Sequence, residues 1–259
     1  MTFSMKKIIS LLFLLPIFVM AQQDSLSSGI YSWKEPKKES KKNISSAILF
    51  EGKVYDMEWL QMSANKLIPS IIKNIEKVPG NEEQLIIIKS GSLTLVLKDS
   101  AYPIGAGSSA LIMPGEKYSL QNKGNESCNY YEMKYRSKLS IDIERGKTSG
   151  GSWIKDWNKI EFKPHDKGGR RDFFERPTAM CKRFEMHVTT LNQGIKSHDP
   201  HTHRAEEIIV VVDNKTEMQI RDKFYKGNTG SIYYLGSNVS HAIKNDGVGP
   251  CTYFAFQFE

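Results

Sequence analysis

Three histidines and two glutamates lie within the ten residues "HDPHTHRAEE", at positions 198–207. The chain has 259 residues and six histidines, so half of its histidines are gathered here. His201 and His203 are two residues apart, which on a β-strand places both side chains on one face, about 6.6 Å apart along the chain. Imidazole and carboxylate groups that converge in this way suit a divalent transition metal. The stretch therefore predicts a metal site.

Two further residues could belong to the same site. Glu207 shares the parity of the two histidines but lies about 13 Å further along a straight strand, so it needs a turn at 204–206 to reach the same ion. His241 would have to come from another strand. Glu206 has the opposite parity, and we expect it to be structural.

The elements that must position these residues occur twice in the chain. The segment "EEQLIIIKSGSLTLVL" resembles "EEIIVVVDNKTEMQI", and one offset of 123 residues links the two through apolar runs and turns. Upstream, Met57 is matched with Met186 at an offset of 129, which predicts a loop six residues longer in the first copy. We interpret this as a tandem duplication. The offset of 123 produces the following pairs: Glu83 with Glu206, Gln84 with Glu207, Gly107 with Gly230, Tyr118 with His241, Asn122 with Asn245 and Cys128 with Cys251.

Both copies have the pattern of β-proteins. Short β-rich runs flank Ser90-Gly91 in the first copy and Asp213-Asn214 in the second, and these residues favour turns. One helix is predicted, over "NKLIPSIIKNIEK", with Pro69 interrupting it. Closely spaced short strands favour an all-β sandwich or barrel.

The second copy resembles the cupin family in both of that family's motifs. His201, His203 and Glu207 match the first motif, His-x-His, three residues, Glu. Residues 230–245 match the second motif, with His241 at its ligand position. The resemblance implies that these four residues bind a divalent transition metal, Mn, Fe, Ni, Co or Zn, with one or two coordination positions left open. An open position is typical of a catalytic metal.

Some residues depart from the family pattern. In the second copy, turn residues of the motifs are replaced by Asn214, Gly236 and Asn238, which leaves the ligands intact. In the first copy, every ligand position is changed, to Val78, Gly80, Gln84 and Tyr118. The resemblance therefore implies two tandem jelly-roll (cupin) β-barrels, a degenerate N-terminal one and a metal-binding C-terminal one. This organisation is similar to that of the (S)-ureidoglycine aminohydrolases, but their ligand pattern differs, so their activity is not expected here.

Further residues are candidates for substrate binding. On a strand, Glu185, His187 and Thr189 share one face, but the sequence does not tell whether that face lines the interior. His187 and His198 could line a pocket, although isolated histidines are more often structural. Arg170 and Arg171, in "HDKGGRRDFFERP", suit carboxylate or phosphate groups, unless the segment is a solvated basic loop.

The chain is predicted to divide into five parts. Residues 1–21 have two lysines, an apolar run and small residues before Gln22, which is typical of a signal peptide. A flexible basic leader at 22–47 precedes the first copy, 48–137. A joining segment, 138–179, leads to the second copy, 180–259. We expect an exported protein, periplasmic or secreted, with no membrane span in the mature chain.

The formal net charge is +7, part of which comes from "KEPKKESKK", without the interleaved aromatic residues of a nucleic-acid-binding surface. No nucleic-acid partner is expected. Cys128, Cys181 and Cys251 are odd in number and lack metal-ligand spacing. A homodimer is compatible with the family resemblance.

Two functions remain open. The first is a metal-dependent enzyme for a small anionic or carbohydrate-derived metabolite, of isomerase, hydrolase or dioxygenase type. The second is a non-catalytic small-molecule binding or storage-like protein. The resemblance to a fold cannot decide between them.

Overall fold

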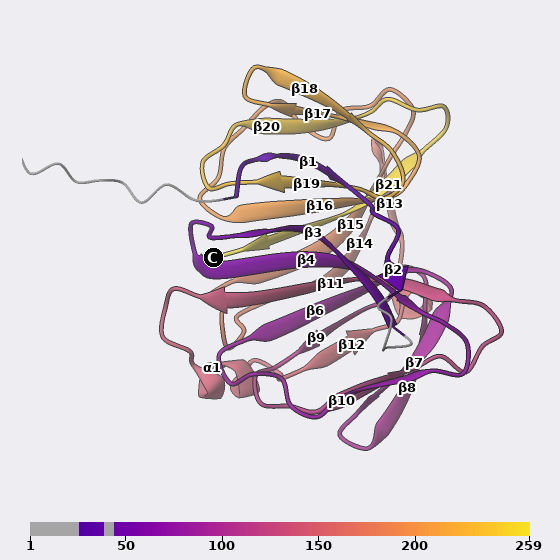
Figure 1. Cartoon of the computed structure of the whole chain (residues 1–259). Helices are drawn as coiled ribbons and strands as arrows, with labels where there is room; N and C mark the ends of the chain where they lie inside the picture. The colour runs from indigo at the N-terminus through magenta and orange to yellow at the C-terminus, as the bar shows by residue number, and fades with distance from the viewer. Residues whose placement is uncertain (1–25, 39–43) are drawn as a thin grey trace, which may run out of the picture.

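The computed structural model describes residues 26–38 and 44–259. The predicted signal peptide, 1–21, lies outside these residues. The described chain is almost entirely β-structure, in two seven-stranded sheets and two smaller sheets of four and three strands. Figure 1 shows the two large sheets next to each other in the middle of the molecule, with the small sheets at opposite ends. The predicted all-β fold with two tandem copies is confirmed.

The first copy has one large and one small sheet. Its large sheet has the order β12-β9-β6-β11-β4-β3-β2, and its small sheet has the order β5-β10-β7-β8. The strands are β2 (Lys37–Lys38), β3 (Ile44–Gly52), β4 (Met57–Leu67), β5 (Ile72–Ile75), β6 (Glu83–Ser90), β7 (Ser92–Leu97), β8 (Ser100–Gly105), β9 (Ser109–Ile112), β10 (Tyr118–Gln121), β11 (Cys128–Ser137) and β12 (Trp153–Lys155).

The second copy repeats this plan. Its large sheet has the order β1-β19-β16-β21-β15-β14-β13, and its small sheet has the order β18-β17-β20. The strands are β1 (Gly29–Ser32), β13 (Lys163–His165), β14 (Gly168–Arg176), β15 (Phe184–Leu191), β16 (Glu206–Asp213), β17 (Thr216–Ile220), β18 (Lys223–Gly227), β19 (Ser231–Leu235), β20 (His241–Asn245) and β21 (Cys251–Phe258).

The described residues contain one α-helix, α1 (Ile143–Thr148), and one 3-10 turn, η1 (Trp157–Lys159). Asp142 caps α1 by accepting a hydrogen bond from the backbone N–H of Arg145. Within the described part of the chain, no helix has the length and apolarity needed to cross a membrane.

The predicted helix over "NKLIPSIIKNIEK" is wrong. Asn65 to Leu67 continue β4 and pair with β11, and Ile72 and Ile75 belong to β5, which pairs with β10. Ser70, directly after Pro69, has a φ of 64°, which breaks the chain into two strands. Pairing with neighbouring strands outweighs the weak helical pattern of this segment.

The predicted alignment of Met57 with Met186 is also wrong. Met133 of β11 pairs with Met62 of β4, and Phe256 of β21, which follows Met133 by 123 residues, pairs with Met186 of β15. Met62 is therefore the counterpart of Met186, at an offset of 124. The segment "YDMEWLQM" contains two methionines, and only strand pairing decides which one is equivalent.

The two copies exchange strands at their edges. β1, from the predicted leader, pairs with β19 of the second copy, and β12, from the joining segment, pairs with β9 of the first copy. β13 and β14, also from the joining segment, extend the second large sheet. The expectation of a flexible leader over 22–47 is therefore wrong for β1 and for the start of β3, whose backbone N–H and C=O groups are paired in sheets.

Alternation along the central strands produces three apolar cores. In β6, Leu85 and Ile87 face the core shared by the two large sheets, and Ile86 and Ile88 face the interior of the first copy. In the second copy the equivalent strand β16 alternates in the same way between the shared core and its own interior. Because both faces are buried, these strands have continuous apolar runs in the sequence.

Candidate metal centre

His201, His203 and His241 come together at one end of the second copy. His201 and His241 form an isolated antiparallel bridge, in which each backbone N–H donates to the other residue's carbonyl oxygen at 3.2 and 3.0 Å. One ring nitrogen from each of the three histidines lies within 4.8 Å of the other two. His241 is at the start of β20, so a strand far away in sequence supplies the third imidazole, as predicted.

Two of the imidazoles are oriented by the backbone. Nδ1 of His203 lies 2.7 Å from the carbonyl oxygen of Ala205, and Nδ1 of His241 lies 2.8 Å from that of Val239. A carbonyl oxygen can only accept, so in the neutral form of both rings Nδ1 carries the proton, which leaves the lone pair on Nε2 for a metal. This arrangement is typical of histidines that bind a metal through Nε2.

Glu207 points into the same space. Its Oε2 lies 3.2 Å from Nε2 of His203 and 3.0 Å from Nε2 of His241. The bends between His203 and β16 bring the carboxylate back towards the histidines, which a straight strand would not allow. Burial acts to raise the pKa of Glu207, but contacts with the two imidazoles outweigh it and lower the pKa to about 2. A buried, ionised carboxylate in contact with two imidazoles requires a cation, which is a bound metal ion or, without one, a protonated imidazole.

The same place in the first copy has different chemistry. The Tyr118 hydroxyl donates to Oε1 of Gln84 at 2.7 Å, so the counterparts of His241 and Glu207 also touch, but as a neutral pair. Glu132 lies beside them and forms an ion pair with Lys73, whose ammonium nitrogen is 3.3 Å from Oε1. Val78, the counterpart of His201, is fully buried. In the first copy an ammonium group supplies the positive charge, and the imidazoles are missing.

A pocket of about 350 Å³ opens beside the candidate centre, bordered by Glu207, His201 and His241. Its other polar lining residues come mainly from β15, β21 and the segment before His201. They are His165, Lys167, Arg170, Glu185, His187, Thr189, Ser197, His198, Tyr253 and Gln257. The volume is in the usual range for small-molecule sites, about 300–1,000 Å³.

Some of the predicted substrate-binding residues line this pocket, and one does not. His187 and His198 line the pocket, and the ring of His198 lies 4.0 Å from that of His201. Arg170 also lines it, but its Nε and Nη2 bind Asp172 and Glu185. Arg171, the other arginine predicted as a possible substrate-binding residue, does not line this pocket, because neighbours on a strand point to opposite faces.

Arg171 instead packs among the aromatic residues of the joining segment. Its guanidinium carbon lies 4.6 Å from the ring centre of Trp157 and 4.9 Å from that of Phe162. These are cation–π contacts, which position the segment against the sheet. Arg171 is therefore not among the residues that line the pocket.

Glu185, Gln257 and Tyr253 were not predicted as pocket residues. Glu207 pairs with Gln257, and Gln257 pairs with Glu185. Glu207, Gln257 and Glu185 therefore lie in one row across β16, β21 and β15. Gln257 also approaches Nε2 of His203 at 3.4 Å. Their shared parity with Glu207 was a usable signal, but it required the strand order to be known.

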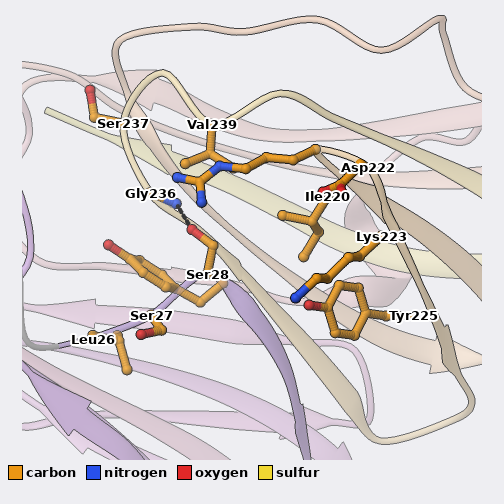
Figure 2. A pocket seen from close by; sticks show the side chains of 12 residues that line it. Leu26, Ser27, Ser28, Ile220, Asp222, Lys223, Tyr225, Gly236, Ser237 and Val239 are labelled. Atoms are coloured by element: carbon orange, nitrogen blue, oxygen red, sulfur yellow. Dashed lines mark hydrogen bonds between the residues drawn. The ribbon is translucent and has the colours of Figure 1, made fainter.

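A larger cavity, of about 520 Å³, lies at the rim between β1 and the β17–β18 hairpin. Figure 2 shows its lining side chains, with Ser28 accepting a hydrogen bond from the backbone N–H of Gly236 at 2.9 Å. Asp222 is its single carboxylate, and its lining contains no histidine or cysteine. The chemistry of the donors, and not the volume, therefore identifies the pocket beside the histidines as the candidate site.

Comparison with known proteins supports the same region. Residues 187–256 match the family model described as cupin domain. This match includes His187, the three clustered histidines and Glu207. The curated proteins contain no match to the sequence.

Several solved structures share the fold. AerE from Microcystis aeruginosa is 16% identical, with a TM-score of 0.66 over 89% of this chain and 99% of that one. The protein Ylba from E. coli is 13% identical, with a TM-score of 0.66 over 86% of both chains. The oxalate decarboxylase of Lactobacillus farciminis, in complex with formate, is 11% identical, with a TM-score of 0.64 over 90% of this chain and 86% of that one. At these identities the likeness is one of fold.

Proposed function

We propose that the chain is an exported, metal-dependent enzyme that acts on a small anionic or carbohydrate-derived metabolite. His201, His203, Glu207 and His241 hold the metal. The observation that carries the proposal is the cluster of three imidazoles, of which two contact the buried carboxylate of Glu207 and are already oriented for Nε2 ligation.

The donor set restricts the ion. Three nitrogen donors and one carboxylate suit Mn, Fe, Co, Ni or Zn better than Ca or Mg, which prefer oxygen ligands. When bound, such an ion supplies Lewis-acid polarisation of a carbonyl or carboxylate oxygen. The isomerase, hydrolase and dioxygenase types are all compatible with this donor set.

The pocket favours an anionic ligand of modest size. Lys167 and two histidines, His165 and His198, lie around it, while the charge of Arg170 is already matched by Asp172 and Glu185. Burial lowers the pKa of His198, so this side chain contributes a neutral imidazole near pH 7. A carboxylate-bearing metabolite fits the remaining positive charge.

Metal analysis tests the site. Purified full-length protein is expected to hold about one equivalent of a divalent transition metal, measured by elemental analysis. His203→Ala is expected to lose at least tenfold in metal affinity, because it removes one of four ligands. Tyr118→Phe, at the position that matches His241 in the first copy, is the matched control and is expected to keep wild-type metal content.

Wild-type metal content in His203→Ala, with the fold intact by circular dichroism, contradicts the assignment. The enzymatic part has its own test, a thermal-shift screen of the metal-loaded protein with sugars, uronates and organic acids, because a ligand stabilises by mass action. Stabilising ligands that remain chemically unchanged would favour the alternative, a non-catalytic binding or storage-like protein.

Export is proposed from residues 1–21 alone, which have the pattern of a signal peptide. Expression with these residues in a bacterial host, followed by fractionation and N-terminal sequencing, tests it. A mature protein that begins at Gln22 in the periplasm or medium is expected, and an unprocessed cytoplasmic protein contradicts it.

A further inference from the structure

His187 and Glu185 form a hydrogen-bonded pair in the wall of the pocket. Both are on β15, two residues apart, so both point to the interior of the second copy. Nδ1 of His187 lies 2.9 Å from Oε1 of Glu185. Neither residue is close to a metal ligand in sequence.

Glu185 is held in place by two arginines. Nη2 of Arg170 donates to its Oε1 at 2.8 Å, and Nη2 of Arg183 donates to its Oε2 at 2.7 Å. The hydrogen bond with His187 is the largest cause that lowers the pKa of Glu185 to about 2, with Arg170 adding to it. The carboxylate is therefore ionised and can only accept hydrogen bonds.

An ionised Glu185 fixes the tautomer of His187. Nδ1 must carry the proton that is donated to Glu185, so in the neutral ring Nε2 has a free lone pair. Within the described part of the chain, Nε2 of His187 has no hydrogen-bond partner. A carboxylate that orients a histidine in this way, with the opposite nitrogen open to the substrate, is the arrangement used for general bases.

Space for a substrate separates His187 from the candidate metal centre. His187 pairs with Ala255 of β21, and Ala255 pairs with Ile209 of β16, so the strands of His187 and Glu207 are two steps, about 10 Å, apart. Ala255 is the smallest residue in this row and leaves the pocket open above it. Among the described residues, the imidazole of His187 makes no ring contact with the clustered histidines.

The first copy has neither the histidine–glutamate pair, nor a small residue at the position of Ala255, nor the clustered imidazoles. Ser63 occupies the place of His187, and Glu132 occupies the place of Ala255, where its carboxylate pairs with Lys73. The histidine–glutamate pair and the space above Ala255 therefore occur only in the copy that has the clustered imidazoles. This association is an independent argument that they serve the same site.

We propose that His187 is the proton-accepting residue of this pocket and that Glu185 is its positioning residue. The substrate is a small carbonyl compound with a hydrogen on the carbon next to the carbonyl group, and it lies over Ala255 between the candidate metal centre and His187. This inference rests on the proposed metal-dependent function and narrows it to a proton transfer.

The proposed step conserves atoms and electrons. The C–H bond next to the carbonyl group breaks, and its proton moves to Nε2 of His187. The electron pair forms a C=C bond, while the carbonyl π pair moves onto the oxygen. Return of the proton to the same carbon re-forms the carbonyl group and regenerates neutral His187, so no oxidant or reductant is consumed.

The charged and titratable groups that surround His187 come from four strands. Glu185 is on its own strand, β14 contributes Arg170 and Asp172, and β21 contributes Tyr253. Lys163 of β13 pairs with Asp172 at 3.0 Å. Asp172 and Arg170 are bound to each other, so Glu185 is the charged group that contacts the imidazole directly.

The first measurement determines which ring nitrogen of His187 carries the proton. Full-length protein labelled with ¹⁵N-histidine and loaded with Zn²⁺ is studied by long-range ¹H–¹⁵N correlation. His187 is expected to be protonated at Nδ1 in the wild type, and Glu185→Gln is expected to lose this preference. Glu175→Gln is the matched control, because Glu175 binds Nε of Arg183 at 2.8 Å but does not contact His187.

The second measurement follows exchange of carbon-bound hydrogen for deuterium in ²H₂O, by ¹H NMR, with pyruvate, dihydroxyacetone and D-galacturonate as probes and Mn²⁺-loaded protein. His187→Gln is expected to slow exchange by about 10²-fold or more while metal content stays at the wild-type value. Glu185→Gln is expected to lower the plateau of the pH–rate profile, because His187 loses its preferred tautomer. Glu175→Gln is expected to leave the profile unchanged.

The outcomes separate this inference from the proposed function. A wild-type protein without bound metal contradicts the proposed function itself. If metal is bound, no exchange with any of the three probes overturns the role of His187, as does equal exchange by wild type and His187→Gln. A His187 ring protonated at Nε2 in the wild type overturns it as well.

Discussion

At the scale of single residues, the second copy contains two carboxylates with different positive partners, the buried Glu207 and the half-buried Glu185. Glu207 contacts two imidazoles, and Glu185 contacts one imidazole and two guanidinium groups. Both have a pKa lowered to about 2, so both carry charge at neutral pH. The positive partners differ: the imidazoles around Glu207 are free to bind a metal, whereas the arginines beside Glu185 are permanent cations.

The contribution of Glu185 to the free energy of unfolding should depend on pH in the acidic range. Its pKa is lowered from an ordinary value of 4.5 to about 2, so its contribution to the free energy of unfolding is fully present above pH 4.5 and is lost as the pH falls towards 2. Denaturation curves of wild type and Glu185→Gln from pH 2 to pH 7 are expected to show a stability difference that is constant near neutrality and shrinks below pH 4.5. A difference that grows on acidification would contradict the assigned contacts.

At the scale of elements, strand alternation gives adjacent glutamates different roles. Glu207 faces the interior of the second copy, and Glu206 faces the first copy, where its two oxygens accept from the backbone N–H groups of Tyr55 and Asp56 at 3.0 Å. The Tyr234 hydroxyl also donates to Glu206. The predicted structural role of Glu206 agrees with these contacts, which join the β3–β4 connection to β16.

Glu83 of the first copy makes the equivalent contact. Glu83 accepts from the backbone N–H of Ala179 at 2.9 Å and from the hydroxyls of Thr178 and Tyr135 at 2.7 Å. Residues 178 and 179 follow 55 and 56 by the same offset of 123 that relates Glu206 to Glu83. In each copy, an equivalent buried carboxylate therefore binds the segment that leads into β4 or β15 of the other half of the molecule. The repeat relates the two glutamates, but their partners are known only from the tertiary structure.

Removal of this contact should destabilise the chain. Glu206→Ala leaves two backbone N–H groups without an acceptor, so we expect a loss of about 2–5 kcal/mol in the free energy of unfolding. Urea denaturation measures it, with Glu58→Ala, an exposed position on β4, as a control expected to change stability by about 0.5 kcal/mol or less. Equal stability of the two variants would show that the contact contributes little.

At the scale of the whole molecule, the two copies form one folded body through a shared core and exchanged strands. β1 covers the edge of β19, and its Tyr31 ring packs 4.6 Å from that of Phe50 in the first copy. Trp33, just after β1, packs edge-on against Tyr131 at 5.0 Å. The N-terminal strand therefore contacts both copies at once. Figure 1 shows β1 beside β19.

Truncation tests the contribution of β1. Removal of residues 1–33 uncovers the edge of β19 and the apolar surface under Tyr31, so amides of β19 (Ser231–Leu235) are expected to exchange faster in hydrogen–deuterium exchange mass spectrometry. Removal of residues 1–25 alone retains β1 and is the matched control. Unchanged protection of β19 in the longer truncation would contradict a stabilising role for β1.

The sequence by itself determined the repeat, the all-β class and four residues that meet at one place. The repeat and the class depend on local periodicity and on one offset, and the four residues depend on the resemblance of two motifs to those of the cupin family. The tertiary structure decided which face of β15 lines the pocket, which methionine matches Met186, and that β1 and β12 cross between copies. Parity tells which side chains share a face, but only long-range strand pairing tells which face is enclosed. For the same reason "HDPHTHRAEE" predicted His201, His203 and Glu207, whereas the partnership of His187 with Glu185 in the opposite wall became visible only in the fold.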